Sequence, residues 1–364
     1  MGKNRGISGL LNALSRRQFM RGAAAAGISI AVMPEFAAAA GEKRLNFYSW
    51  DTYIGETTLA DFARATGIEV KMDLFADNDE LFAKLREGNP GYDVIVPSAN
   101  WVARMIPAGM LAPLDHSLIP NIKNITPRFM ANAGFDPARK YSLPYTWGTI
   151  GIGYRKSRFT APPASWKWLY DSDKYSGRLA LLSESDVLLG MALKYLGHSV
   201  NTTDQTQLAA AEALIIRQKP HIKVFAEDNG QDLLASGEVD LVMEWNGDIA
   251  QLMAEDGDIG YVVPDEGGLL WEDTLAIPKG APHIQNAHAF INFIHDPEVN
   301  AGIAATVQYA TPNQAALALM DKAYTENPAI FAPDSIIARS ESLNYLGEDA
   351  ITRRQDACTR IFAA

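Results

Sequence analysis

A regular alternation of strand-like and helix-like segments begins at residue 45 and constrains the fold more than any other feature of the sequence. The pattern predicts strands at 45–49, 68–74 and 92–96, and helices at 56–65 and 78–86. Gly67 stands where a left-handed residue commonly ends a helix. Strands that alternate with helices need crossover connections, which are right-handed and give a mainly parallel sheet. The chain is therefore predicted to have an α/β fold.

The middle and the end of the chain repeat this pattern. Strands are predicted at 179–182, 222–225, 241–244 and 261–263, and helices at 187–196, 207–218, 285–295, 298–307 and 351–362. Two α/β lobes are the simplest arrangement, although a single large sheet also fits the pattern. Because no long linker separates the lobes, the chain is expected to cross between them in extended segments at 145–154 and 269–278.

The first 40 residues have the composition of an export signal. Arg16 and Arg17 are followed by an apolar run at 22–33 and by small residues at 37–40, where a peptidase could cut. The apolar run is too short to span a bilayer, which takes roughly 20 residues. Paired arginines indicate the twin-arginine route, with a basic N-terminal helix as the alternative. The mature protein is therefore expected in the periplasm.

Composition narrows the range of partners. The chain has a net charge of −11 at pH 7, and the predicted signal is basic, so the mature part is more acidic still. This acidity argues against a nucleic-acid partner and modestly favours a cationic ligand, although it serves solubility equally well. The single cysteine, Cys358, excludes an internal disulfide. No segment after the signal is long and apolar enough to span a membrane.

The motifs of common enzyme classes are missing. The sequence contains no Gly-x-Ser-x-Gly nucleophile motif and no phosphate-binding P-loop. Gly151 and Gly153 form only part of a dinucleotide-binding motif. His288 and His295 could share one helix face, but no metal-binding pattern accompanies them, and we interpret them as surface histidines. We therefore expect no catalytic residue, no metal and no cofactor.

Aromatic and acidic residues recur where predicted strands end. These clusters are Trp50-Asp51-Thr52-Tyr53, Ser98 to Trp101, Glu184 to Asp186, Trp245 to Asp248, Trp271 to Asp273, and Tyr309 to Asn313. Ligands of open α/β sheets bind beyond the carboxyl ends of the strands. Carboxylates accept charge-assisted hydrogen bonds from ammonium groups, and aromatic faces cover methylenes and attract cations. The joint pattern indicates a flexible organic cation, although each residue alone could be a core residue or a helix cap.

At these residues the sequence resembles the periplasmic spermidine/putrescine-binding proteins of polyamine uptake transporters, over nearly the whole mature chain. The resemblance rests on the order and spacing of several strings: residues 46–50, 66–70, 92–98, 143–148, 245–247, 264–268 and 309–313. It implies the two-lobed type II periplasmic binding protein fold, with a ligand cleft between the lobes. Residues 43–147 with 273–317 would form the first lobe, and residues 148–272 with 318–364 the second.

The resemblance also implies which residues bind the ligand. The aromatic residues are Trp50, Tyr53, Trp245, Trp271 and Tyr309; the carboxylates are Asp186, Asp248 and Asp273; and the polar contact is Ser98. Two further acids, Asp51 and Glu184, match the family pattern only with a shift of one residue. Asn100 replaces a family aromatic, and Leu343 or Asn344 replaces a family glutamine, so the length of the ligand stays open.

The resulting hypothesis is a monomeric binding protein that captures a polyamine of the putrescine or spermidine type for an ABC permease of the inner membrane. A second hypothesis keeps the fold and changes the ligand to another cationic amine or an amino-acid derivative. A third is an enzyme that is exported after loading a cofactor, which the twin-arginine route makes worth testing. The absence of cofactor motifs argues against this third hypothesis.

Overall fold

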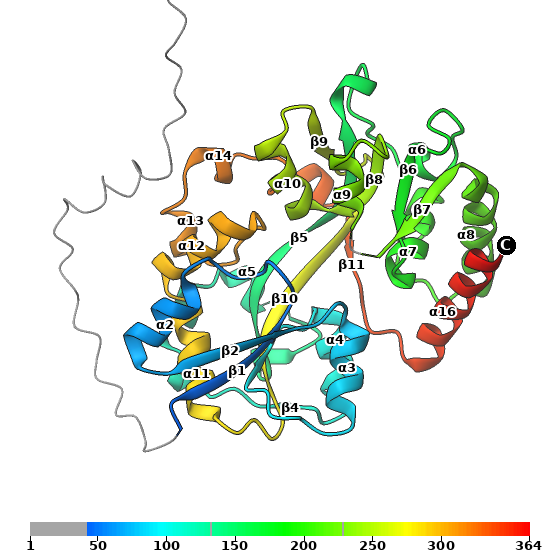
Figure 1. The fold of residues 1–364 in the computed structure, drawn as a ribbon. Coiled ribbons are helices and arrows are strands. Elements are labelled where there is room, and N and C mark those ends of the chain that lie inside the picture. The colour runs from blue at the N-terminus through cyan, green and yellow to red at the C-terminus, as the bar shows by residue number, and fades with distance from the viewer. Residues whose placement is uncertain (1–41, 132, 228) are drawn as a thin grey trace, which may run out of the picture. The chain divides into compact units, whose positions relative to one another are not determined.

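The computed structural model describes residues 42–131, 133–227 and 229–364, and the predicted export signal at residues 1–40 lies outside them. The strands are β1 (Arg44–Ser49), β2 (Glu69–Leu74), β3 (Val94–Ile95), β4 (Leu111–Ala112), β5 (Ser142–Arg155), β6 (Leu179–Leu182), β7 (Ile222–Ala226), β8 (Leu241–Trp245), β9 (Ile259–Val262), β10 (Leu269–Pro278) and β11 (Glu341–Ser342). In the described residues they join in one mixed sheet whose main path is β2-β1-β3-β10-β5-β8-β6-β7 (Figure 1).

Helices alternate with these strands as the sequence predicts. They are α2 (Thr58–Thr66), α3 (Asn78–Arg86), α4 (Ala99–Met105), α5 (Pro127–Ala131), α6 (Lys167–Tyr170), α7 (Ser185–Tyr195), α8 (Gln205–Gln218), α9 (Gly230–Ala235), α10 (Asn246–Glu255), α11 (Ile284–Ile294), α12 (Pro297–Val307), α13 (Gln314–Leu317), α14 (Lys322–Thr325), α15 (Asp334–Ile337) and α16 (Glu348–Ala363). Gly67 ends α2 with a φ of 72°, in the left-handed region predicted for it. No helix in the described part of the chain has the length and apolar character of a membrane span.

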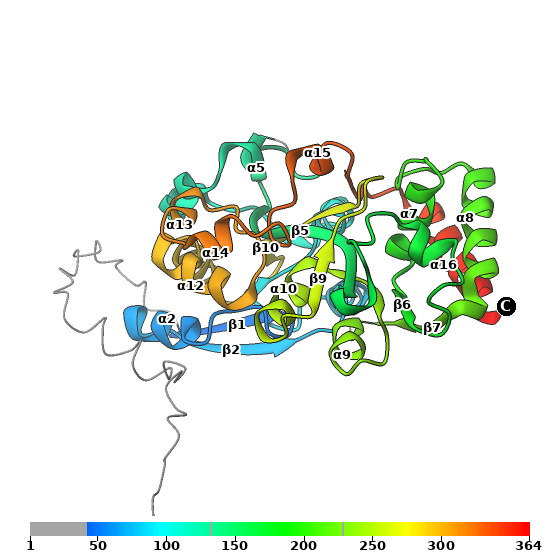
Figure 2. The same ribbon diagram turned by 90° about the horizontal axis from the view of Figure 1, so that it is seen from above.

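Two parallel groups of strands occupy opposite ends of the sheet. In the first, which we call the β1 half, β1 pairs in parallel with β2 and β3. In the second, the β6 half, β6 pairs in parallel with β7 and β8. Helices α7, α8 and α16 contact one another beside the β6 half, as both views show (Figures 1 and 2). Parallel strands with crossover helices are the arrangement that the alternating pattern predicts.

Each half has its own apolar core. Phe47 of β1, Phe62 of α2 and Phe290 of α11 pack edge to face in the β1 half, with ring centroids 5.0–5.1 Å apart. In the β6 half, the fully buried Trp166 and Leu188 belong to a separate cluster. The sequence left two lobes and one large sheet as alternatives. The structure combines a continuous sheet with separate cores, and the exact lobe boundaries stay a prediction.

The middle of the sheet is antiparallel, which differs from the mainly parallel sheet predicted. β5 and β10 run antiparallel to each other along most of their length, with Trp271 opposite Gly148 and Asp273 opposite Thr146. They contain the two predicted crossing segments. A chain that leaves one half along the first crossing must return along the second in the opposite direction, so the antiparallel pairing follows from the connectivity.

Strand β3 is shorter than the predicted strand at 92–96. Just after β3, the carbonyl oxygen of Val96 accepts a hydrogen bond from the indole N–H of Trp50 at 3.0 Å. On the other side, the carboxylate of Asp93 accepts the backbone N–H of Asn46 at 2.7 Å. These side-chain bonds add to backbone bonds just beyond the ends of β3, where the N–H of Asp93 donates to the carbonyl of Asn46 and the N–H of Thr274 donates to that of Pro97.

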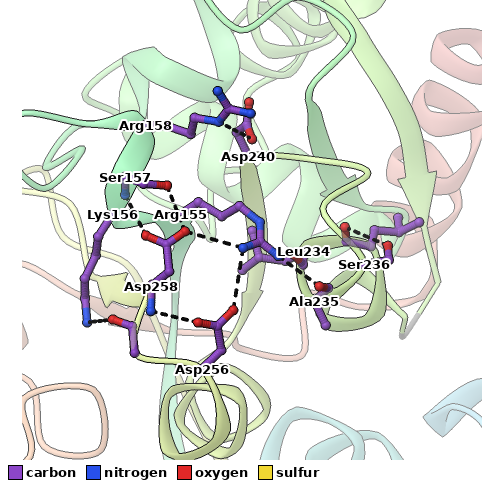
Figure 3. Close-up of polar contacts among 12 residues, drawn as sticks. Arg155, Lys156, Ser157, Arg158, Leu234, Ala235, Ser236, Asp240, Asp256 and Asp258 are labelled. Atoms are coloured by element: carbon purple, nitrogen blue, oxygen red, sulfur yellow. Dashed lines mark hydrogen bonds and ion pairs between the residues drawn. The ribbon is translucent and has the colours of Figure 1, made fainter.

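The far end of β5 is fixed by Arg155 (Figure 3). Its guanidinium donates to the carbonyl oxygens of Leu234 and Ala235 at 2.7 and 2.8 Å. It also pairs with the carboxylates of Asp256 and Asp258 at 3.5 and 3.4 Å. One side chain therefore ties the end of β5 to the last turn of α9 and to the segment that follows α10.

Candidate functional site

A buried carboxylate, Asp273, lies in the middle of the β5–β10 pair. Only 7 % of the residue is exposed. The hydroxyl of Ser98 donates to Oδ1 at 2.6 Å, and the phenol of Tyr53 donates to Oδ2 at 2.7 Å. Among the described residues, no lysine, arginine or histidine pairs with it. We call Asp273 with these two donors the Asp273 centre.

The environment of Asp273 alters its acidity. Burial, with a smaller contribution from the negative charge of neighbouring Glu272, raises the pKa of Asp273 to about 6. The hydrogen bonds from Ser98 and Tyr53 oppose this rise because they stabilise the ionised form. The carboxylate is therefore mostly ionised at neutral pH, in a place where an unpaired charge is costly.

The strands and helices hold the two donors in a fixed orientation. Asn78 donates from Nδ2 to the Ser98 hydroxyl at 3.0 Å, so the hydroxyl proton of Ser98 remains for Asp273. Tyr53 also shares a hydrogen bond with the hydroxyl of Thr146, which stands opposite Asp273 on β5. The register of β5 and β10 shifts directly after Asp273. Such a bulge re-aims side chains and is frequent beside functional sites.

Four predicted aromatic residues form one connected group beside this centre. The ring of Trp271 stands almost perpendicular to Trp245, at 5.9 Å, and to Tyr309, at 4.9 Å. Tyr309 in turn packs against Tyr53 with 5.5 Å between ring centroids. The indole N–H of Trp271 is buried and has no hydrogen-bond partner within the described residues. The group thus offers aromatic faces together with a free donor.

Two glycines make room for these rings. A Cβ atom at Gly148 would lie 2.5 Å from Cζ2 of Trp271, and one at Gly247 would collide with the ring of Tyr309. Asn246, which lies between Trp245 and Gly247, is fully buried and accepts the N–H of Thr149 at 2.9 Å. Neither glycine nor Asn246 was predicted as a site residue, although both glycines stand within the strings that carry the resemblance.

A second carboxylate, Asp248, is connected to the same aromatic group. It lies in the first turn of α10, and the hydroxyl of Tyr309 donates to its Oδ2 at 2.9 Å. Since Tyr309 packs on Tyr53 and Tyr53 donates to Asp273, the two acids lie at the two ends of a pair of tyrosines. Two carboxylates joined by aromatic rings can receive a ligand that carries two cationic groups.

The remaining predicted residues lie in different settings. Trp50 is half-buried and packs on Phe75 with 4.5 Å between ring centroids. Asp186 lies in the first turn of α7, and its Oδ1 is 3.3 Å from Nη1 of Arg354. Asp51 and Glu184 are the two exposed members of the predicted set, and Oδ1 of Asp51 accepts the N–H of the next residue. The buried Arg354 was not predicted, because one arginine in a charged helix has no distinctive pattern.

No group of three or more histidine, cysteine, aspartate or glutamate side chains in the described part of the chain could hold a metal ion.

His295 is fully buried rather than on the surface, and its burial lowers its pKa to about 4. The neutral imidazole is therefore part of the core of the β1 half. The prediction of surface histidines was wrong at both positions, because His288 lies on the buried face of α11 with 3% exposure and His295, which directly follows α11, is fully buried.

Residues 57–332 match the family model of the bacterial extracellular solute-binding proteins. The chain belongs to this family. It is 35% identical to the putrescine-binding periplasmic protein SpuD of Pseudomonas aeruginosa, over 89% of this chain and 92% of the relative. It is 34% identical to the spermidine/putrescine-binding periplasmic protein of Escherichia coli, over 92% and 94% of the two chains.

The solved structures agree with this assignment. The spermidine/putrescine substrate-binding protein PotD of Streptococcus pneumoniae superposes with a TM-score of 0.79 at 31% identity, covering 88% of this chain and 98% of that one. The predicted periplasmic binding protein fold is therefore confirmed. The predicted periplasmic location is confirmed by the relatives, which are named as periplasmic proteins. These relatives are binding proteins rather than enzymes.

Proposed function

We propose that the protein captures a linear polyamine of the putrescine or spermidine type in the periplasm and delivers it to an ABC permease. The observation that carries this proposal is the Asp273 centre. A buried carboxylate with hydroxyl donors but no cation among the described residues lacks the partner that would offset its loss of hydration. The ammonium group of a polyamine would supply that charge.

The aromatic group supports a chain of methylenes as the rest of the ligand. Trp245, Trp271 and Tyr309 meet edge to face and leave ring faces for other contacts. Such faces cover apolar atoms and attract a nearby cation by roughly 0.5–2 kcal/mol for each contact. Asp248, at the far end of the tyrosine pair, would receive a second ammonium group. We infer that Trp50, Tyr53 and Ser98 complete the site, and that Asp51 and Glu184 lie at its exposed edge.

The relatives support the same ligand class and the same partner. Both curated relatives are named for putrescine or spermidine binding, and the solved neighbour is named as the substrate-binding protein of an ABC transporter. We further infer that the two predicted lobes close on the ligand about β5 and β10, which connect the two halves of the sheet. Closure would bring the β6 half, with Trp245, toward the Asp273 centre.

Isothermal titration calorimetry with putrescine, spermidine, spermine and cadaverine tests the proposal. We expect micromolar or tighter binding of at least one of them. The Asp273→Asn variant should lose about a hundredfold in affinity or more, because a buried ammonium group loses its charged partner. Asp61→Asn is the matched control, since Asp61 is a half-buried carboxylate that pairs with Arg64 on α2, in a different part of the β1 half. Failure of the wild type to bind any of these amines would contradict the proposal.

A further inference from the structure

An ion pair between two helices joins the β1 half to the β6 half. Arg104 of α4 and Glu348 at the start of α16 are 244 residues apart in the sequence. Nε and Nη2 of Arg104 donate to Oε1 and Oε2 of Glu348 at 2.7 and 2.6 Å. Such a bidentate pair has a defined geometry and is stronger than a single contact between point charges. The two helices are therefore joined by a specific contact.

The two helices belong to different cores. Met105 of α4 is fully buried in an apolar cluster that contains Tyr48 of β1, in the β1 half. Ile361 of α16 is fully buried in the cluster of the β6 half, where α16 contacts α7 and α8 (Figure 1). A movement of one half relative to the other would therefore change the distance between Arg104 and Glu348.

Two aromatic rings of the β1 half hold Arg104 in place. Its guanidinium carbon lies 4.1 Å from the ring centroid of Phe82 and 4.8 Å from that of Trp101, and its side chain is 14% exposed. Glu348 is 58% exposed and accepts the hydroxyl of Tyr345 at 3.0 Å. Because the guanidinium is already oriented by the rings, it loses little freedom when it binds the carboxylate. This pair should therefore contribute more than an ordinary surface ion pair.

Acidic side chains of both halves face each other at this contact. Burial raises the pKa of Asp79 on α3, and nearby acids, Glu348 among them, add to the rise. The positive charge of Arg104 opposes it. Loss of Arg104 would therefore leave Asp79 and Glu348 as like charges on the two halves, which would repel each other.

We propose that Arg104 and Glu348 form a latch that holds the two halves together around a bound ligand and slows its release. The inference rests on the proposed closure of the lobes on a polyamine. Helix α4 begins directly after Ser98, whose hydroxyl donates to Asp273, so the latch acts on the helix that adjoins the Asp273 centre. A bound ligand and the latch favour the same closed arrangement, and each should therefore strengthen the other.

The rate of putrescine release tests the latch, and stopped-flow fluorescence can follow it through Trp245 and Trp271 in the proposed site. Arg104→Gln should raise the release rate about fivefold and weaken putrescine binding by a similar factor, the upper range for a partly exposed ion pair. Arg360→Gln is the matched control, because Arg360 of α16 forms a bidentate pair with Glu212 of α8 at 2.7 Å, within the β6 half. An unchanged release rate in Arg104→Gln would overturn the inference.

A double-mutant cycle shows whether the two residues act through each other. Glu348→Gln alone should also raise the release rate, and the double variant should release putrescine no faster than Arg104→Gln, since each change removes the same interaction. Thermal unfolding establishes that the three variants are folded. Additive effects of the two changes would show that the residues act separately, and would overturn the latch.

Distances in the ligand-free protein distinguish failure of the latch from failure of the proposed function. Spin labels at Lys71→Cys on β2 and Arg217→Cys on α8 report the separation of the halves, since these side chains are 62% and 63% exposed and the natural Cys358 is buried. In double electron–electron resonance, Arg104→Gln should move the distances toward larger values. An unchanged distribution would overturn the latch. A shift in a protein that binds no amine would support the latch and contradict the polyamine function alone.

Discussion

Two neighbouring acids of β10, Glu272 and Asp273, are both shielded from solvent, but only Glu272 pairs with a cationic side chain of the described residues. Glu272 pairs with Arg139 at 2.6 Å, and the Arg139 side chain is 1% exposed. Asp273 receives hydroxyl groups and no cation from the described residues. Consecutive residues of a strand point to opposite faces, so one strand presents two acids to two environments. The difference separates a structural charge, which the protein neutralises, from a charge left for the ligand.

The largest expected effect concerns the structural side of this comparison. Glu272→Gln should lower the free energy of unfolding by about 3–5 kcal/mol, because it leaves Arg139 buried without its counterion. Urea unfolding with circular dichroism measures this loss. Putrescine affinity should change by less than about threefold as long as the variant is folded. A stable Glu272→Gln variant with strongly weakened binding would reverse the roles assigned to the two acids.

Asp273→Asn should have the opposite effect on the ligand-free protein. The pKa of Asp273 is raised by burial from 3.8 to about 6, so its ionised form is disfavoured by folding. By linkage, this cost is absent below about pH 4 and grows as the pH rises to about 6, and it amounts to about 3 kcal/mol at most. The variant should therefore unfold at a higher urea concentration than wild type at pH 8, and at a similar one at pH 4. Equal destabilisation at both pH values would contradict this account.

Ligand affinity should depend on pH with the opposite sign. An ammonium group binds the ionised form of Asp273, so affinity should be constant above the pKa of about 6 and fall below it. The loss should be about fivefold between pH 6 and pH 5, because the ionised fraction of a carboxyl with this pKa falls by about that factor. Calorimetric titrations of putrescine over pH 5–8 measure this profile. In Asp273→Asn the weak residual binding should show no such step, which is the control for other titrating groups.

Tyr53→Phe should give the smallest effect. Removing the phenol deletes one hydrogen bond to the ionised Asp273 and should weaken putrescine binding by about fivefold to tenfold. Because this hydrogen bond lowers the pKa of Asp273, its loss should also move the step in the affinity profile to higher pH. Tyr145→Phe is a suitable control, since the Tyr145 hydroxyl donates to the carbonyl of Tyr53 rather than to the carboxylate. A step that does not move would show that the phenol does not act on Asp273.

The sequence predicts local structure well and side-chain partners poorly. The helix α3 and the strand β6 have the predicted bounds, because apolar periodicity and nearby turn residues define such segments. The antiparallel middle of the sheet was missed, because pairing across β5 and β10 joins residues that are more than a hundred positions apart. The resemblance implies that Tyr53, Trp271 and Tyr309 belong to one site, and the structure shows that the ring of Tyr309 contacts the other two.

The partners of the acids could not be read from the sequence. Asp273 and Asp186 look alike as acids beside predicted strands, but only the fold brings Arg354 from the last helix to Asp186. The same holds for Asn78, which orients Ser98 from a different helix. Local sequence patterns predict which residues follow the end of a strand. The free energy of a buried charge depends on neighbours that are distant in sequence, and no local pattern encodes them.

The most direct test of the central claim is the pKa of Asp273 itself, measured by carbon-13 NMR of the carboxyl groups with Asp273→Asn as the assignment control. In ligand-free protein we expect a pKa of about 6, because the buried carboxylate has no cation. With saturating putrescine the pKa should fall by about two units or more, because an ammonium group now favours the ionised form. An ordinary aspartate pKa in the ligand-free protein, or a raised pKa that putrescine does not lower, would contradict the claim that this carboxylate is reserved for the ligand.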